Sequence, residues 1–281
     1  MPAKTTKAVT NNPKRIAKKA VAKKSAKKAS KKPVKKKAAN SKALPANREP
    51  VASRASSSLP KRPAARRDLD PERVQSILKV LRETYPDAEC ALVHSSPWQL
   101  LVATILSAQC TDVRVNMVTP KLFAAYPTPE AMAKAPLEAI EEIIRTTGFY
   151  HNKAKSIQGA GRVISENFGS KVPQTMAELL TVPGAARKTA NVVLGVAYGK
   201  SEGVVVDTHV FRIARRLGLT RSETPQAVEQ DLMKVIPKDR WIQISHEMIH
   251  LGRQICEARK PKCAACPLET LCSAPDKTWH S

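Results

Sequence analysis

The first 67 residues carry a charge that prevents them from folding as a compact domain. The chain of 281 residues has 48 Lys and Arg and 24 Asp and Glu, and residues 1–67 hold 22 of the basic residues but a single acid, Glu49. Stretches such as the three lysines at 35–37, set among Ala, Pro and Ser, lack the apolar side chains whose burial would offset the entropy of ordering them. We therefore expect residues 1–67 to form a disordered Lys/Ala/Pro-rich basic tail, and the folded part to begin at Asp68.

The charge of this tail favours a polyanion as its partner. Blocks of Lys and Arg bind nucleic-acid phosphates and release counterions as they do so; a purely solubilising role is the alternative. The longest apolar stretch, Leu100–Leu106, is too short to cross a bilayer, and no secretory or mitochondrial signal is recognisable. We therefore expect no membrane partner and an intracellular location, cytoplasmic and nucleoid-associated, or nuclear in a eukaryote.

Periodic apolar residues predict that residues 68–281 fold as helices. The tripeptide Asp70-Pro71-Glu72 is a helix start signal, and apolar side chains follow it at helical spacing at Val74, Ile77, Leu78 and Leu81. A second such pattern over Leu137–Ile144 stops before Gly148, a residue type that favours the left-handed conformation at helix ends. The only strand-like run, Val204–Val206, lies between two helix patterns. The predicted fold class is therefore all-α.

Four of the six cysteines are crowded near the C-terminus with the spacing C-x6-C-x2-C-x5-C: Cys256, Cys263, Cys266 and Cys272. Clustered cysteines in an intracellular chain indicate a metal site rather than disulfides. Zinc ribbons usually have two short cysteine pairs, whereas one short pair with longer flanking reaches suits a cubane cluster of iron and sulfide. The spacing therefore predicts a [4Fe–4S] cluster on these four thiolates, with the isolated Cys90 and Cys110 as core residues.

Three cations lie in the reach between the first two of these cysteines: Arg259, Lys260 and Lys262. A loop that is stiffened by proline and held at both ends by a cluster can present cations to phosphates, so we expect these residues to contact DNA. The alternative is that they only balance the negative charge of the cluster.

The segment His246–His250 (HEMIH) matches H-E-x-x-H, the helical signature of zinc hydrolases. We interpret this match as a coincidence. The helix that carries it runs within six residues into Cys256, and no downstream His or Glu is free of the cysteine cluster to act as a third ligand. We expect both histidines to be core residues.

Residues 182–186 (VPGAA) predict a tight turn between two helices, Met176–Thr181 and Arg187–Tyr198. Such a turn aims backbone N–H groups and the positive end of a helix at an anion, and so grips one phosphate without reading sequence. We therefore expect this turn to bind DNA through Pro183, Gly184, Ala186 and Arg187.

Four ordered motifs resemble the endonuclease III family of helix-hairpin-helix DNA glycosylases. They are LSAQCTD (106–112), VPGAARKTAN (182–191), VDTHVFR (206–212) and the four-cysteine tail, and the resemblance extends from about Asp70 to Cys272. It implies a six-helix barrel domain over 90–200 that contains the hairpin 182–186, and an iron–sulfur cluster domain formed by 68–89 plus 201–281. It also implies a monomeric enzyme of base excision repair whose partner is damaged double-stranded DNA.

The resemblance implies that Lys188 and Asp207 are the catalytic pair of a bifunctional DNA N-glycosylase and AP lyase that removes oxidised pyrimidines. The lysine amine attacks C1′ as the base leaves, and the resulting Schiff base allows β-elimination 3′ to the abasic site. The amine must be uncharged to attack, and we expect its position at a helix N-terminus beside Arg187 to lower its pKa. Asp207 caps the predicted helix Thr208–Leu217 and, held ionised there, can stabilise the cationic sugar.

The target base must leave the stack before its sugar carbon can be reached. In the family, a glutamine and an apolar wedge fill the vacated space, and here Gln109 and Phe149 occupy those positions. Leucine is common at the second position, and an aromatic residue there can stack on the neighbouring base. Core packing after a helix stop is the alternative for Phe149.

Two features depart from the family pattern. Ala186 stands where the hairpin usually ends in glycine, which adds a methyl group where the backbone approaches phosphate. The segment between Lys188 and Asp207 is one residue longer than usual, which we assign to a tolerated surface-loop change around Gly199–Gly203.

Three functions are alternatives to the removal of oxidised pyrimidines. Adenine glycosylases of the superfamily have no lysine at the position of Lys188 and carry a catalytic glutamate near Ala103, so adenine is rejected as the substrate. A pyrimidine-dimer glycosylase of the same family would use the same lysine. A weakly catalytic DNA-binding nucleoid protein, with a dominant tail and an impaired hairpin, is the alternative from another class.

Overall fold

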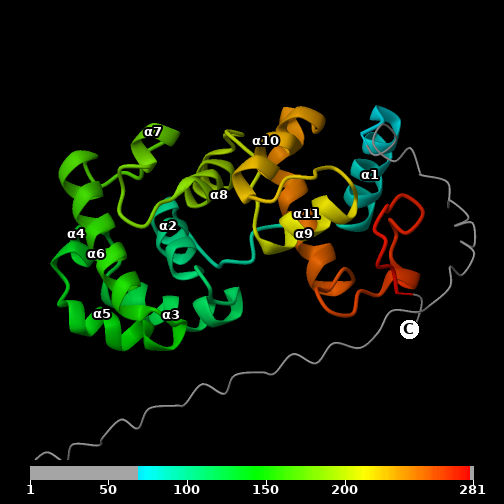
Figure 1. The fold of residues 1–281 in the computed structure, drawn as a ribbon. Coiled ribbons are helices and arrows are strands. Elements are labelled where there is room, and N and C mark those ends of the chain that lie inside the picture. Colours follow the sequence, from blue (N-terminus) through cyan, green and yellow to red (C-terminus); the bar gives the residue numbers. More distant parts are fainter. Residues whose placement is uncertain (1–68, 279–281) are drawn as a thin grey trace, which may run out of the picture. The chain divides into compact units, whose positions relative to one another are not determined.

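The computed structural model describes residues 69–278, and the tail predicted over 1–67 lies outside the described residues. No strand occurs between 69 and 278, so the prediction of an all-α fold is confirmed. The elements are α1 (Pro71–Thr84), α2 (Pro97–Leu106), α3 (Asp112–Ala125), α4 (Pro129–Lys134), α5 (Leu137–Ile144), η1 (Arg145–Thr147), α6 (Tyr150–Asn167), α7 (Met176–Leu179), α8 (Arg187–Tyr198), α9 (Thr208–Arg216), α10 (Pro225–Val235), η2 (Lys238–Arg240), α11 (Trp241–Gln254) and η3 (Cys263–Ala265) (Figure 1).

Several of these helices begin where a short polar side chain satisfies a free backbone N–H group. The hydroxyl groups before α2, α3, α4, α7 and α10 each accept a hydrogen bond from the backbone three residues on; they belong to Ser96, Thr111, Thr128, Thr175 and Thr224. The predicted start of α1 is confirmed at Pro71, but Asp70 makes no such side-chain bond. The helix predicted over Met176–Thr181 is shorter than expected, because it ends at Leu179.

A first hydrophobic core is built around α2, which is buried along nearly its whole length. Its members run from Leu92 to Leu194 and come from α2 to α8. Within it, α4 lies directly against α6, and Gly161 makes this approach possible because an added Cβ would lie 2.6 Å from the carbonyl oxygen of Pro129. This core fixes the helices on either side of the predicted hairpin, since α8 packs against both α2 and α7.

A second hydrophobic core joins α1 to α9, α10 and α11. Its members come from Val74–Ala88 and, far along the chain, from Val204–Leu268. The strand-like run Val204–Val206 forms no strand; the N–H group of Val205 donates to Ser245 Oγ at 3.1 Å. The chain passes from one core to the other near residues 89 and 200. The assignment of two domains stays a prediction.

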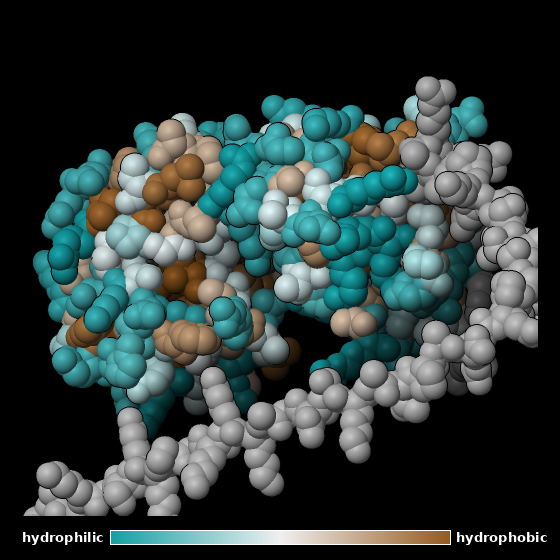
Figure 2. Space-filling view, in the orientation of Figure 1, coloured by the Kyte–Doolittle hydropathy of each residue, from teal (hydrophilic) through white to brown (hydrophobic). Residues whose placement is uncertain are grey.

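The surface of both groups of helices is mostly hydrophilic on the face drawn in Figure 2, with smaller apolar patches. None of the helices between 69 and 278 combines the length and the apolar composition that crossing a bilayer requires.

Candidate functional site

The predicted hairpin is present between α7 and α8, and two glycines allow it to lie close to the first core. Gly184 has φ +81°, and a Cβ there would lie 3.0 Å from Ser156 Cβ and 3.2 Å from Ile105 Cγ2. An added Cβ at Gly159 of α6 would lie 3.3 Å from the ring of Pro183. Larger residues at these glycines would push the turn away from α2 and α6, so the position of the hairpin is set by close packing.

Lys188 is the second residue of α8, and its side chain is exposed. It makes no hydrogen bond or ion pair with any residue of the described chain. Ala186 is the N-cap of α8, makes no side-chain cap and is also exposed, so its extra methyl group displaces nothing inside the protein. The first N–H groups of a helix have no partner inside the helix, and Lys188 belongs to this first turn of α8.

Arg187 is held by an acid on another helix. Its Nε and Nη2 atoms donate three hydrogen bonds of 2.9 to 3.1 Å to the carboxylate of Glu229 on α10, whose side chain is 7% exposed. Asn191 Nδ2 donates to the same carboxylate at 2.9 Å. We call these three residues the Glu229 network. The network joins the N-terminal turn of α8 to α10 and places the negative charge of Glu229 against Arg187. Glu229 was not among the residues predicted from the sequence.

Gly203 is buried against the Glu229 network. An added Cβ at Gly203 would lie 2.1 Å from Glu229 Oε1 and 2.8 Å from Asn191 Nδ2. The segment Gly199–Gly203 is therefore exposed at its first glycine and closely packed at its second, and the tolerance of the extra residue stays a prediction.

Asp207 is the N-cap of α9, as predicted. Its Oδ1 atom accepts hydrogen bonds from the N–H groups of His209 and Val210 at 2.9 and 2.8 Å. Its Oδ2 atom has no hydrogen-bond partner among residues 69–278, and the residue is half-buried. One oxygen therefore fixes the carboxylate, which leaves the other available to a ligand.

Gln109 and Phe149, the two residues predicted to fill the space of an extruded base, both have a left-handed backbone. Their φ angles are +52° and +49°, a conformation that is rare for residues other than glycine. Phe149 is 65% exposed, which excludes the alternative that it packs in the core. Both residues therefore project from strained turns that follow α2 and η1, respectively.

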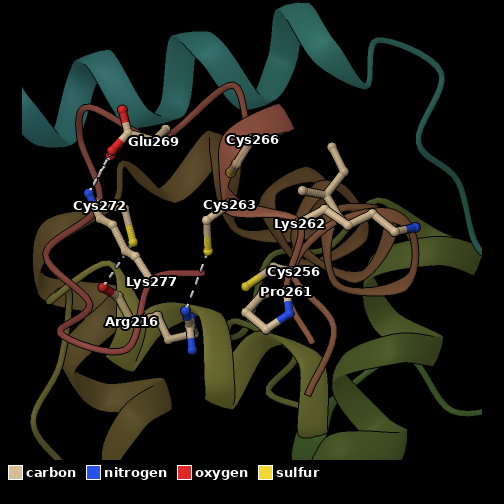
Figure 3. A pocket seen from close by; sticks show the side chains of 10 residues that line it. Arg216, Cys256, Pro261, Lys262, Cys263, Cys266, Glu269, Cys272 and Lys277 are labelled. Carbon is tan, nitrogen blue, oxygen red and sulfur yellow. Dashed lines mark hydrogen bonds and ion pairs between the residues drawn. The ribbon is translucent and has the colours of Figure 1, made fainter. Parts of the chain in front are cut away.

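The four clustered cysteines line one pocket with Arg216, Lys262, Glu269 and Lys277 (Figure 3). Cys263 is buried and the other three are half-buried. Arg216 Nη2 lies 3.9 Å from Cys263 Sγ, and Arg216 also pairs with Asp276. Burial raises the pKa of the Cys256 thiol, and the guanidinium groups of Arg216 and Arg212 oppose this effect, so they favour the thiolate form.

Two arginines of α9 serve this pocket, and sequence reasoning missed both. Arg212 Nη2 donates to the carbonyl oxygen of Cys256 at 2.6 Å and to that of Gly252 at 3.2 Å, which fixes the chain where α11 ends. Arg216 Nε is buried and has no partner in the described part of the chain. Arg212 belongs to the VDTHVFR motif, which was the available signal, whereas Arg216 had none.

The pocket suits an anionic group held by sulfur. It combines four cysteine thiols with an unpaired donor of a buried cation, so thiolates bound to a cluster would find compensating charge there. Among residues 69–278, no three His, Cys, Asp or Glu side chains are placed to hold a single metal ion.

The H-E-x-x-H segment lies on α11 and contributes to packing. Glu247 is fully buried and accepts two hydrogen bonds of 2.7 and 3.0 Å from Arg240 Nη2. The ring of His250 lies 6.0 Å from that of Tyr85 in a tilted contact. The carboxylate of Glu247 is thus satisfied by an arginine, which agrees with our interpretation of the match as a coincidence.

The cations of the cysteine loop differ in their surroundings. Lys262 pairs with Glu257 at 3.2 Å and donates to the carbonyl oxygen of Gln254 at 3.1 Å. Arg259 and Lys260 are exposed and have no partner within the described range. Lys262 is therefore paired within the protein, whereas Arg259 and Lys260 are free to meet an external anion.

Comparison with known proteins decides the family. A family model described as the HhH-GPD superfamily base excision DNA repair protein matches residues 102–238. Endonuclease III of Synechocystis sp. is 56% identical over 201 residues, which cover 72% of this chain and 92% of that protein. The chain belongs to the endonuclease III family. Endonuclease III of Bacillus subtilis is 44% identical over 210 residues, covering 74% of this chain and 95% of that protein.

Solved structures of endonuclease III agree with this assignment. A non-covalent endonuclease III–DNA complex matches with a TM-score of 0.70 and 43% identity, over 73% of this chain and 95% of that chain. A trapped endonuclease III–DNA covalent intermediate matches with the same TM-score and 44% identity, over 73% and 96% of the two chains. This member of the endonuclease III family is a DNA glycosylase and AP lyase of base excision repair.

Proposed function

We propose that this protein removes oxidised pyrimidines from double-stranded DNA with Lys188 as the nucleophile and Asp207 as its partner. The observation that carries the proposal is the position of Lys188: an exposed amine with no partner among residues 69–278, in the first turn of α8 and directly after the hairpin. A covalent endonuclease III–DNA intermediate among the similar structures supports it, because a covalent intermediate requires a nucleophile on the protein.

The proposed reaction has two steps, attack of the amine on C1′ and β-elimination. The lone pair of the Lys188 amine forms a bond to C1′, the base departs with the electrons of the glycosidic bond and a proton, and opening of the sugar gives a protonated Schiff base. Loss of a proton from C2′ then expels the 3′ phosphate. Asp207, fixed through Oδ1, holds Oδ2 ready to stabilise the positive sugar and to accept the proton of the attacking amine.

Access to C1′ is assigned to the two left-handed turns. Gln109 and Phe149 project from them into solvent, where their side chains can enter a duplex and replace an extruded nucleotide. The turn formed by Pro183, Gly184, Ala186 and Arg187 grips a phosphate beside the lesion, and Arg259, Lys260 and Lys262 bind phosphates further along the strand. We also propose that the enzyme acts as a monomer and is associated with the nucleoid in the cytoplasm.

A [4Fe–4S] cluster is proposed in the pocket of Cys256, Cys263, Cys266 and Cys272. When bound, it supplies four iron–thiolate bonds that tie the C-terminal loop to the second core. Arg216 would balance its charge through the buried Nε and through Nη2, which lies near Cys263. Iron and sulfide in equal amounts in the purified protein, lost together in Cys263→Ser, would support this assignment.

The proposed reaction is tested with a duplex that contains one thymine glycol, treated with borohydride during incubation. The wild-type protein should release the base, nick the strand 3′ to the site and form a reduced covalent adduct, whereas Lys188→Ala should form none. Lys155→Ala is the matched control: it removes an exposed lysine of α6 instead of the one on α8, and it should react normally. An adduct in neither the wild type nor the control would support a DNA-binding protein, and reaction only with a pyrimidine-dimer duplex would replace the substrate class.

A further inference from the structure

Lys153 of α6 is a buried cation that the proposed reaction does not use. The residue is 5% exposed, and its Nζ atom donates a hydrogen bond of 2.8 Å to the carbonyl oxygen of Thr147. Burying an ammonium group away from water is unfavourable unless hydrogen bonds compensate for it. A lysine in this position therefore needs an explanation, and its acceptor lies two residues before Phe149.

The turn held by Lys153 is strained. Gly148 and Phe149 both have positive φ angles, +69° and +49°. A left-handed conformation is unfavourable for a residue with a side chain, and it persists only where its surroundings fix it. Packing fixes Phe149 only weakly, because the residue is 65% exposed. The constraint must come from the residues on either side.

Both sides of the turn are fixed by hydrogen bonds in which Lys153 takes part. On one side, Thr147 is 2% exposed, its hydroxyl group donates to the carbonyl oxygen of Ile144 at 2.8 Å, and its own carbonyl accepts from Lys153 Nζ. On the other, the backbone N–H of Lys153 donates to the carbonyl oxygen of Phe149 at 3.1 Å in the first turn of α6. Lys153 is thus hydrogen-bonded to both sides of the turn, through its side chain to Thr147 and through its backbone to Phe149.

The same amine lies near the second left-handed turn. Burial lowers the pKa of Lys153, and the nearby Cys110 thiol partly opposes this effect. Cys110 directly follows Gln109, the other residue proposed to enter the duplex. The hydrogen bond of the ammonium group is to the turn of Phe149, and its interaction with the turn of Gln109 is electrostatic only.

We propose that Lys153 is a positioning residue for base extrusion: by holding the Thr147 carbonyl it keeps Phe149 in the left-handed conformation that projects the ring from the surface. This inference rests on the proposed insertion of Phe149 into the duplex. Lys153 itself does not touch DNA, because it is buried. Without its hydrogen bond, the turn relaxes and the ring samples other directions, so the effect falls on extrusion and not on bond cleavage.

The test is a double-mutant cycle of Lys153→Met and Phe149→Ala, read in two assays. The first measures single-turnover excision of thymine glycol from a duplex, which requires extrusion. The second measures nicking of an abasic site in a single strand, which does not. Lys153→Met should slow excision by about tenfold without changing single-strand nicking. The double variant should be no slower than Phe149→Ala alone, since coupled residues are non-additive.

Two further variants complete the design. Lys155→Met removes an exposed lysine of the same helix and should leave both assays unchanged. Lys153→Gln keeps a polar group in the buried site, covers the case in which the Met variant does not fold, and should show the same non-additivity.

Additive effects, or an equal loss in both assays, would overturn the role of Lys153. If Phe149→Ala alone leaves excision unchanged, the insertion of Phe149 is wrong and this inference fails with it. In that case adduct formation by Lys188 would still stand, so the two failures are distinguishable.

Discussion

Replacing Glu229 with Ala should loosen the helix that carries Lys188. The variant leaves the guanidinium of Arg187 and the buried amide of Asn191 without their shared acceptor. Breaking a fully buried ion pair costs about 3–5 kcal/mol. Because the Arg187 side chain is 40% exposed and water can replace part of the lost contact, we expect about 3 kcal/mol, which corresponds to a fall in Tm of roughly 6–12 °C.

Denaturant titration of the iron-loaded protein measures this loss, and single-turnover adduct formation measures its consequence for Lys188. Glu166→Ala removes an exposed glutamate of α6 and serves as the control. A free energy of unfolding lowered by less than about 1 kcal/mol would place the Glu229 network among ordinary surface pairs. Such a small loss would mean that the Glu229 network does not anchor α8.

Three other predictions concern packing, pH and salt. Gly161→Ala should lower the free energy of unfolding by about 1–3 kcal/mol in denaturant titration, because its methyl group meets backbone at 2.6 Å; Gly159→Ala should cost less. Burial lowers the pKa of His246, so the unfolded state binds more protons below about pH 6.5 and stability should decrease there as pH falls; His246→Gln should flatten that decrease. DNA affinity of the full chain should fall more steeply with salt than that of a chain starting at Asp68; equal slopes would exclude a phosphate-binding tail.

The fold class was predictable because local signals agree with it. Apolar spacing and start signals place α1 and α8 correctly, since an amphipathic helix shows the same period before and after it packs. Where packing decides, prediction failed. Asp70 makes no capping bond although its sequence context favours one, and Gly203 is buried against an acid from α10 that lies far away in the sequence.

The functional residues were predictable where a motif carries them within a few positions. Lys188, Asp207 and the four cysteines each belong to a compact pattern. The residues that hold the site in place come from other elements. Glu229 on α10 binds Arg187, and Lys153 on α6 binds the carbonyl oxygen of Thr147. Such contacts depend on tertiary packing, which no local spacing encodes. The exposure of Phe149 was likewise undecidable from sequence, because a phenylalanine after a helix end packs inward in most proteins.

The proposed mechanism depends on the identity of the nucleophile, which mapping the covalent adduct reveals. The borohydride-reduced complex is digested with protease and nuclease, and the peptide that carries the sugar remnant is sequenced by mass spectrometry. We predict that the remnant lies on Lys188. A remnant on any other residue, or full base release by the wild-type protein without a trapped adduct, would exclude Lys188 as the nucleophile.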